Sequence, residues 1–120
     1  MEKLKHFAVD TDPKIDFQNM DEAALLMIDH AREMAGVPFH ITSTHRTPEQ
    51  SASVGGSTKD SHTEKPCTAF DIGYSDRAQR AKIIYGCIAA GFLRVGINEK
   101  NNHVHVDDSP NLPKPAFWIE

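Results

Sequence analysis

Two stretches of the chain carry apolar residues at intervals of three and four, the period of an α-helix with one buried face. The first begins after Asp21, a residue that suits the N-cap, and runs to about Ala35, where Gly36 ends it. The second runs from Ser75, its expected N-cap, to about Ala90. The predicted buried faces hold Ala24, Met27, Ile28, Ala31 and Met34 in the first helix and Ala81, Ile84, Tyr85 and Ile88 in the second.

Five short segments have the composition or the alternation of β-strands: 38–42, 68–74, 92–97, 103–107 and 116–119. A short helix, with Thr47 as its cap and Pro48 in its first turn, follows the first of them. This order of elements does not alternate regularly enough for a doubly wound sheet. We therefore predict an α+β fold with a small, mostly antiparallel sheet and two main helices, in one domain over residues 1–120.

The charge distribution excludes nucleic acid as a partner. The chain has a net charge of -4, a pI of about 5.9 and no run of Lys or Arg. Its longest nearly apolar segment, 23–28, is too short to span a bilayer, and its N-terminus lacks the apolar stretch of a signal peptide. We expect a monomer that is made in the cytoplasm without membrane insertion. Two cysteines, Cys67 and Cys87, do not make a disulfide framework.

Histidines and carboxylates gather in two segments, "DSHTEKPCTAFDIGY" and "NEKNNHVHVDD". Because side chains alternate along a strand, the second segment places His103, His105 and Asp107 on one face of strand 103–107. Neighbours on that face lie about 7 Å apart, which is too far for easy joint ligation of one ion. One of the two histidines is therefore expected to bind a metal while the other flanks the site.

The first segment offers two more ligands, His62 and Asp71. If strand 68–74 lies near strand 103–107, both residues and one histidine of the pair converge on one ion. Two histidines and one carboxylate with a fourth position free are typical of a catalytic zinc site. The same spacing also suits surface histidines at strand ends, so these residues alone leave both interpretations open.

The segments "SHTEKPCTAFD", "AGFLRVGI" and "EKNNHVHVD", closing near "FW", resemble the M15 family of zinc D-Ala-D-Ala carboxypeptidases and related phage endolysins. The resemblance covers residues 38–118, and the family pattern is S-x-H-x-x-G-x-A-x-D followed by a distal Glu and H-x-H. The signalling domain of hedgehog proteins has the same zinc fold. The resemblance therefore implies a hedgehog/DD-peptidase-like fold with Zn²⁺ as its cofactor.

The resemblance also implies a role for each matching residue. These are His62, Asp71 and His105 as zinc ligands, Glu99 as the general base, His103 as a group that stabilises the reaction centre, and Arg46 and Ser61 as substrate-binding residues. Glu99 lies six residues before His105, and Arg46 lies in "ITSTHRTPEQ", which resembles the segment whose arginine grips the substrate. Asp107 has two open roles, as a second candidate base or as a partner to a histidine ligand.

Three departures from the family pattern concern the loop before Asp71. His62 and Asp71 are nine residues apart, two more than in the pattern, and Ser61 directly precedes His62 where the pattern has one residue between them. Cys67 stands where the family has glycine, and it shares strand parity with Asp71. A Cys67 thiolate in place of His62 is therefore an alternative ligand.

The resemblance implies a zinc peptidase that acts on the peptide stems of peptidoglycan, at the terminal D-Ala-D-Ala bond or at an internal bond such as L-Ala-D-Glu. A short chain without a signal peptide suits a phage or prophage endolysin that is released through a holin and acts in the periplasm or cell wall. Two alternatives are a non-catalytic zinc-containing binding module of the same fold and a metal-free structural domain of a phage particle. Trp118 is expected in the core, or as a wall of the cleft.

Overall fold

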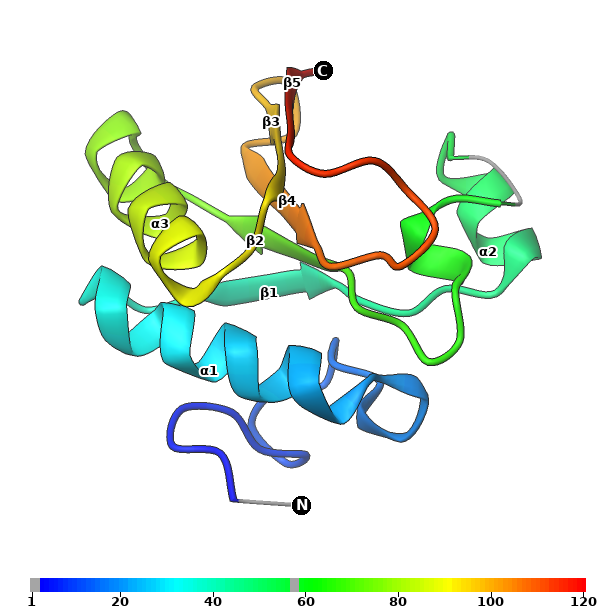
Figure 1. Ribbon diagram of the computed structural model, residues 1–120, viewed down its shortest axis with the longest axis horizontal. Coiled ribbons are helices and arrows are strands. Elements are labelled where there is room, and N and C mark those ends of the chain that lie inside the picture. The colour runs from blue at the N-terminus through cyan, green and yellow to red at the C-terminus, as the bar shows by residue number, and fades with distance from the viewer. Residues whose placement is uncertain (1–2, 57–58) are drawn as a thin grey trace.

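A computed structural model describes residues 3–56 and 59–120. Its elements follow the predicted order, with three strands after the last helix (Figure 1). The helices are α1 (Glu22–Ala35), α2 (Pro48–Ser53) and α3 (Arg77–Ala90), the strands are β1 (His40–Ser43), β2 (Phe70–Gly73), β3 (Arg94–Asn98), β4 (His103–Asp107) and β5 (Ala116–Ile119), and the short 3-10 turns are η1 (Phe17–Asn19) and η2 (Ser61–Thr63).

The strands form one five-stranded sheet in the order β1-β2-β4-β3-β5. The first three neighbouring pairs are antiparallel, and β5 runs parallel to β3 at the edge. The predicted α+β fold is confirmed. Register decides what each face carries: Phe70 pairs with Val106 on one face, while Asp71 pairs with His105 on the other.

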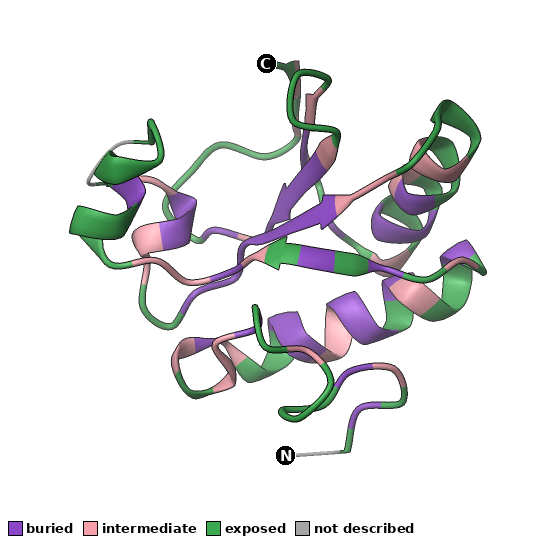
Figure 2. Cartoon of the chain, turned by 180° about the vertical axis from the view of Figure 1, so that it is seen from behind, coloured by how far each residue is buried: buried purple, intermediate pink, exposed green. Residues whose placement is uncertain are grey.

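The apolar face of the sheet is covered by α1 and α3, which also pack against each other (Figures 1 and 2). Asp21 caps α1 as predicted, since its carboxylate accepts the Ala24 backbone N–H at 2.9 Å. Gly36 ends the helix in the left-handed conformation, with φ of 70°. Met34, which was predicted on the buried face of α1, is exposed. None of the described helices is long and apolar enough to cross a membrane.

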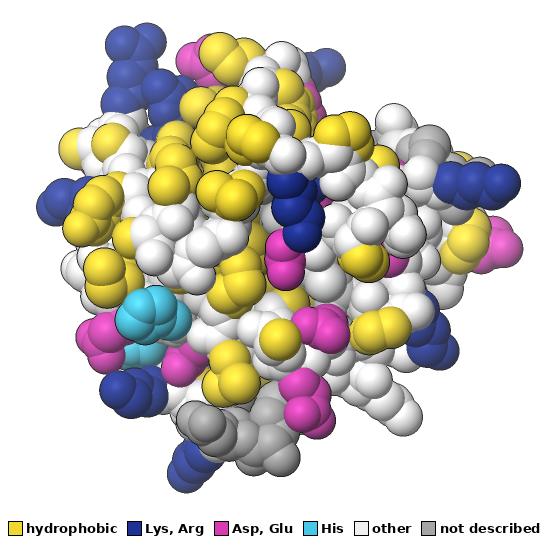
Figure 3. Space-filling view, viewed as in Figure 1, with side chains coloured by type: hydrophobic (Ala, Val, Ile, Leu, Met, Phe, Trp, Pro, Cys, Tyr) yellow, Lys and Arg dark blue, Asp and Glu magenta, His cyan; other side chains and the backbone are white. Residues whose placement is uncertain are grey.

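The structure corrects the cap and the buried face predicted for α3. Asp76, not Ser75, is the N-cap, because its carboxylate accepts the Gln79 backbone N–H at 2.8 Å. The buried residues of the helix are Ile83, Gly86 and Cys87, whereas Ala81, Tyr85 and Ile88 are exposed. Figure 3 shows hydrophobic side chains at the surface over this part of the molecule.

The reason for the rotated face of α3 is a close approach to α1 at Gly86. A Cβ atom at this position would lie 2.4 Å from the Ala31 carbonyl oxygen and 2.6 Å from the Ala35 Cβ. Only a glycine fits between the two helix backbones at that distance. Gly86 therefore faces α1 together with the buried Ile83 and Cys87, and the large apolar residues Tyr85 and Ile88 turn outward.

Replacing Gly86 with alanine tests this contact. Glycine to alanine normally stabilises a helix interior, but here the added methyl group must push α1 and α3 apart. We expect Gly86→Ala to lower the free energy of unfolding by about 1–3 kcal/mol in urea denaturation. Lys82→Ala, at an exposed position of the same helix, is the control and should stay within about 0.5 kcal/mol of the wild type. A stabilised Gly86→Ala protein would contradict the packing described.

Candidate metal centre

The candidate metal centre is built around one cross-strand pair of residues. Asp71 on β2 and His105 on β4 are direct register partners, so both side chains project from the sheet face opposite the helices. The Asp71 Oδ1 and His105 Nδ1 atoms lie 3.0 Å apart, and both residues are buried. This pairing joins the two histidine-containing segments of the sequence at one point.

His62 reaches the pair from η2. Asp60 caps this turn by accepting the His62 backbone N–H at 3.0 Å, and the Arg46 backbone N–H donates to the His62 carbonyl at 2.8 Å. These bonds fix the histidine between β2 and the segment after β1. Its Nε2 atom lies 3.1 Å from Asp71 Oδ1 and 3.2 Å from His105 Nδ1. The longer spacing between His62 and Asp71 therefore does not keep them apart.

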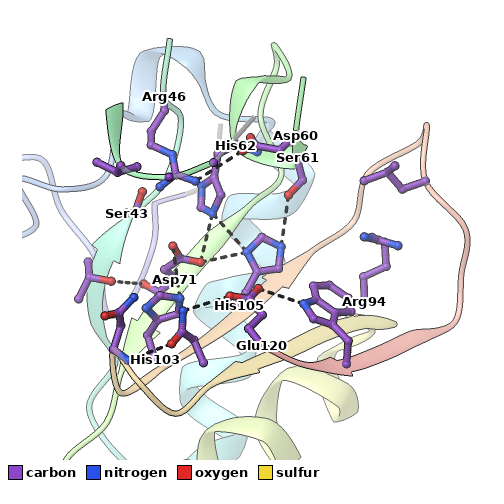
Figure 4. Close-up of a pocket in the computed structure, with 18 of the residues that line it drawn as sticks. Ser43, Arg46, Asp60, Ser61, His62, Asp71, Arg94, His103, His105 and Glu120 are labelled. Carbon is purple, nitrogen blue, oxygen red and sulfur yellow. Dashed lines mark hydrogen bonds and ion pairs between the residues drawn. The ribbon is translucent and has the colours of Figure 1, made fainter. Parts of the chain in front are cut away.

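The three facing atoms have the geometry of a metal-binding group (Figure 4). Their separations are 3.0 to 3.2 Å. Two ligand atoms bonded to a tetrahedral zinc ion at about 2.0–2.1 Å lie about 3.3 Å from each other. His62, Asp71 and His105 thus need little movement to hold zinc, and a set of three donors leaves the fourth position for water or substrate.

Each histidine of the group has a hydrogen-bond partner on its other ring nitrogen. His62 Nδ1 contacts the Thr44 backbone carbonyl at 2.5 Å, and His105 Nε2 contacts Asp107 Oδ2 at 2.7 Å. Carbonyl and carboxylate oxygens accept an N–H, so they hold the proton on the outer nitrogen. The inner nitrogen of each ring is then available to a metal, as in other histidine-ligated sites.

Asp107 is itself held from two sides. It is fully buried, and its Oδ1 atom accepts the Arg94 Nε–H at 2.8 Å and the Ser109 backbone N–H at 3.0 Å. Burial alone would raise the pKa of Asp107, but the hydrogen bonds to His105 and Ser109 and the charges of His105 and Arg94 lower it. Of its two predicted roles, this position behind His105 matches that of a partner to a histidine ligand.

The buried charges also shift the titration of the ligands. Burial alone would raise the pKa of Asp71, but hydrogen bonds from His105 and His62 and their charges hold it well below its usual range. Burial would lower the pKa of His105, yet hydrogen bonds to Asp107 and Asp71 and their charges raise it to about 9. Without metal, His105 is therefore an imidazolium at neutral pH, placed between two carboxylates.

Cys67 is not part of the group, so the alternative of a thiolate ligand is wrong. Its side chain is fully buried, and its Sγ atom lies 3.6 Å from the Ser61 carbonyl oxygen and 3.8 Å from that of His62. Burial raises the pKa of the Cys67 thiol to about 12. A neutral thiol directed at backbone carbonyls is a packed core residue.

The cluster opens into a cleft of about 970 Å³ that Arg46, Ser61 and His103 also line (Figure 4). His103 Nε2 lies 3.9 Å from Asp71 Oδ2, so His103 flanks the three converging atoms, as the strand alternation predicts. Ser61 is buried, and its Oγ atom lies 3.3 Å from His105 Nε2. The structure therefore places Ser61 against a metal-binding histidine, and its role in binding substrate stays a prediction.

Arg46 enters the cleft from the segment after β1. Its Nη2 atom lies 3.8 Å from Asp60 Oδ2, a distance longer than a hydrogen bond. Its Nε atom is buried and has no hydrogen-bond partner among residues 3–56 and 59–120. A buried N–H of a guanidinium without a partner is a donor free to meet an anionic group of a ligand.

The sequence pattern of the Peptidase M15 family matches residues 4–107, which is most of the chain. The protein belongs to the M15 peptidase family. Neither a search of curated proteins nor one of solved structures finds a match. Membership agrees with the mixed, mostly antiparallel sheet and with the His-Asp-His group, since M15 enzymes are metallopeptidases with a hedgehog/DD-peptidase fold.

Glu99 lies away from the metal group of this M15 peptidase. It is on the turn after β3, its side chain is 57% exposed, and its Oε2 atom lies 3.5 Å from Arg80 Nη1 on α3. Asn98, the residue before it, lines the cleft, whereas Glu99 does not. The general-base role that the resemblance implies for Glu99 stays a prediction, and its position speaks against that role.

The sheet edge at β3 and β5 adds two groups to the M15 site: Trp118, for which the sequence left core and cleft wall open, and Arg94, which the sequence did not assign. Trp118 lines the cleft, and its ring centre lies 5.6 Å from that of His105, so it forms a wall of the cleft. The Arg94 guanidinium stacks over the same indole at 5.1 Å. Gly96 makes this possible, because a Cβ there would lie 2.4 Å from Trp118 Nε1. A glycine inside a strand was the available signal of such a close approach.

Asp107→Asn tests the hydrogen bond behind His105. Asparagine keeps the shape but loses the charge that fixes the imidazole, so we expect zinc to dissociate about 10–100-fold more readily. Competition against a chelator of known affinity measures this change. Asp108→Asn is the control, because the neighbouring Asp108 forms only a half-exposed pair with Lys114 at 2.6 Å. Equal zinc affinity in both variants would contradict the assignment of Asp107.

Zinc affinity should also depend on pH with a definite sign. Because the pKa of metal-free His105 is raised to about 9, a proton competes with the metal for this residue at every pH below that value. We expect the apparent zinc affinity to rise with pH, by about tenfold per unit between pH 6.5 and 8.5. The same chelator competition, corrected for the chelator's own protonation, gives the slope. An affinity that does not change over this range would contradict the raised pKa.

Proposed function

We propose that this protein is a zinc-dependent peptidase that cleaves the stem peptides of bacterial peptidoglycan, at the terminal D-Ala-D-Ala bond or at an internal bond such as L-Ala-D-Glu. The observation that carries the proposal is the convergence of His62, Asp71 and His105 at the base of a cleft that also holds a cationic side chain. A closed structural zinc site would use a fourth protein ligand instead. Membership of the M15 family supports a peptide as the substrate.

The donor set fits zinc. Imidazole nitrogens and a single carboxylate oxygen suit zinc better than magnesium or calcium, which take mostly oxygen ligands. Zinc bound there would lower the pKa of a bound water towards about 7 and polarise the scissile carbonyl. The hydrogen bonds that His62 donates to the Thr44 carbonyl and His105 donates to the Asp107 carboxylate orient both histidines before any metal arrives.

Arg46 is proposed to bind a carboxylate of the substrate. A guanidinium donates two parallel hydrogen bonds to a carboxylate, and the Arg46 Nε–H is buried without a partner in the described part of the chain. A carboxypeptidase needs such a group at the free end of its substrate. In an endopeptidase that cuts before D-Glu, the same arginine would bind a carboxylate of that D-Glu residue, on its side chain or on its Cα.

His103 is proposed to stabilise the charge that develops on the carbonyl oxygen. It lines the cleft beside the metal group, with 18% of its side chain exposed, and it lies 3.9 Å from the Asp71 carboxylate. A positioned N–H donor at the edge of a partly dry site stabilises an oxyanion more than water does. Ser61, whose hydroxyl contacts His105, is proposed to bind the substrate beside this histidine.

We further propose a phage or prophage endolysin as the biological setting, made in the cytoplasm and released to the periplasm or cell wall through a holin-type route. A non-catalytic zinc-containing module of the same fold is the second candidate. It is favoured by one observation, the position of Glu99 outside the cleft.

Mass spectrometry of digested peptidoglycan tests the proposed activity. Zinc-loaded wild-type protein should release defined fragments from purified peptidoglycan or from a peptide ending in D-Ala-D-Ala, and their masses identify the bond. Chelator-treated protein and His62→Ala should release none, because each lacks the bound metal. Asp108→Asn, at a residue outside the cleft, should behave as the wild type.

The same assay distinguishes a carboxypeptidase from an endopeptidase when one peptide is supplied in two forms, with a free and with an amidated carboxyl end. If Arg46 grips the terminal carboxylate, Arg46→Lys should raise KM for the free acid and leave that for the amide unchanged. Zinc bound by the wild type with no cleavage of any substrate would refute the peptidase and favour the binding module.

A further inference from the structure

Hydrolysis of a peptide needs a group that takes a proton from the attacking water, and a carboxylate in the cleft is the usual choice. The inference below rests on the proposed peptidase function. Three carboxylates of the described residues line the cleft: Asp60, Asp71 and Glu120. The other nearby carboxylates, Asp107 and Glu99, do not line it.

Two of the three carboxylates already have other roles. Asp71 is one of the converging metal-binding groups, with its Oδ1 atom facing both histidines. Asp60 caps η2, and its Oδ2 atom accepts the Ser51 hydroxyl at 2.6 Å. Both carboxylates are therefore committed to holding His62 or a metal, which leaves Glu120.

Glu120 is held on the cleft side of the sheet, directly after β5. Its backbone N–H donates to the Ile97 carbonyl at 2.8 Å, which continues the pairing of β5 with β3. Its Oε1 atom accepts the Trp118 indole N–H at 3.0 Å, and its Oε2 atom accepts the Asn98 side-chain amide at 3.1 Å. These donors are neutral, so they position the carboxylate without neutralising its charge.

The two hydrogen-bond partners of this exposed carboxylate connect it to residues around the metal group. Asn98, which binds Glu120, is the direct cross-strand partner of His103 on β4. Trp118, which also binds Glu120, has its ring centre 5.6 Å from that of His105. Figure 4 shows Glu120 and His105 on the same side of the sheet, with the dashed bond from the indole to the carboxylate.

We propose that Glu120 is the proton acceptor of this peptidase. Its carboxylate takes one proton from the attacking water while the water oxygen bonds to the scissile carbonyl carbon. The C–N bond then breaks, and Glu120 returns that proton to the leaving amine nitrogen, so that one water is consumed and one acid and one amine are formed. His103 on β4 lies between Asp71 on β2 and Glu120 after β5 in the strand order, and it keeps its proposed role at the carbonyl oxygen.

Neither the family pattern nor the spacing of motifs indicates this role. The match to the M15 family ends at residue 107, before β5 begins. The carboxylate that the resemblance assigns, Glu99, lies next to Arg80 on the helix side of the turn. Glu120 reaches the cleft only because β5 pairs in parallel with β3 and Gly96 makes room for Trp118.

The test compares Glu120→Gln with Glu99→Gln in zinc-loaded protein on the peptide that the wild type cleaves. Glutamine at 120 can still accept the indole N–H but cannot take a proton. We expect its kcat to fall about a hundredfold or more with KM unchanged, and the acid limb of its pH–rate profile to disappear. Glu99→Gln should keep kcat within about twofold of the wild type, because its side chain lies outside the cleft.

Two readouts other than activity show that the site of Glu120→Gln is intact. Its zinc affinity should equal that of the wild type, because Glu120 is not in the metal-binding group. Its urea denaturation midpoint should also equal that of the wild type, because the exposed Glu120 side chain is not part of the core. Loss of zinc by Glu120→Gln would make it a metal-binding residue and overturn the proposal.

The remaining outcomes separate this inference from the proposed function. If the wild type cleaves and Glu120→Gln cleaves equally fast, the inference is wrong while the peptidase stands. Loss of activity in Glu99→Gln alone would restore the role that the resemblance implies for Glu99 and would also overturn the inference. If the wild type cleaves no substrate, the proposed function fails and the inference fails with it.

Discussion

The structure of the site depends on one buried arrangement, the His105 imidazole between the carboxylates of Asp71 and Asp107. The antiparallel pairing of β2 with β4 sets the first contact, and the alternation of β4 sets the second. Two buried carboxylates are costly unless cations neutralise them. The Arg94 guanidinium neutralises Asp107. The proton on His105 neutralises Asp71 until a metal ion replaces that proton. The fold therefore holds a position at which a divalent cation is favoured on electrostatic grounds.

Sequence reasoning predicted the part of this site that follows from the period of a strand. Alternation alone placed His103, His105 and Asp107 on one face. The other histidine-containing segment offered His62 and Asp71 as further ligands, and the resemblance then assigned them. The α+β fold followed in the same way from the order of helices and strands. Reasoning from periodicity was wrong for α3, because it ranks large apolar residues as buried, whereas the contact with α1 selects the small residue Gly86.

Other features of the site depend on contacts that no local pattern contains. The Thr44 carbonyl reaches His62 because a backbone bond from Arg46 ties η2 to the segment after β1. Glu120 reaches the cleft because β5 returns to pair in parallel with β3, far outside the motifs. Both are consequences of tertiary pairing, so neither a motif nor a hydrophobic period could indicate them. The alternative Cys67 ligand failed for a related reason, since strand parity cannot show that a thiol is packed against carbonyls.

The central claim is that the two histidine-containing segments form one metal site with a specific choice of ring nitrogens. The most direct measurement is a crystal structure of the zinc-loaded protein with anomalous data collected at the zinc edge. The account predicts a single strong peak bonded to His62 Nε2, one oxygen of Asp71 and His105 Nδ1, with Asp107 still on His105 Nε2. A peak bonded to other residues, or to the opposite nitrogen of either histidine, would contradict it.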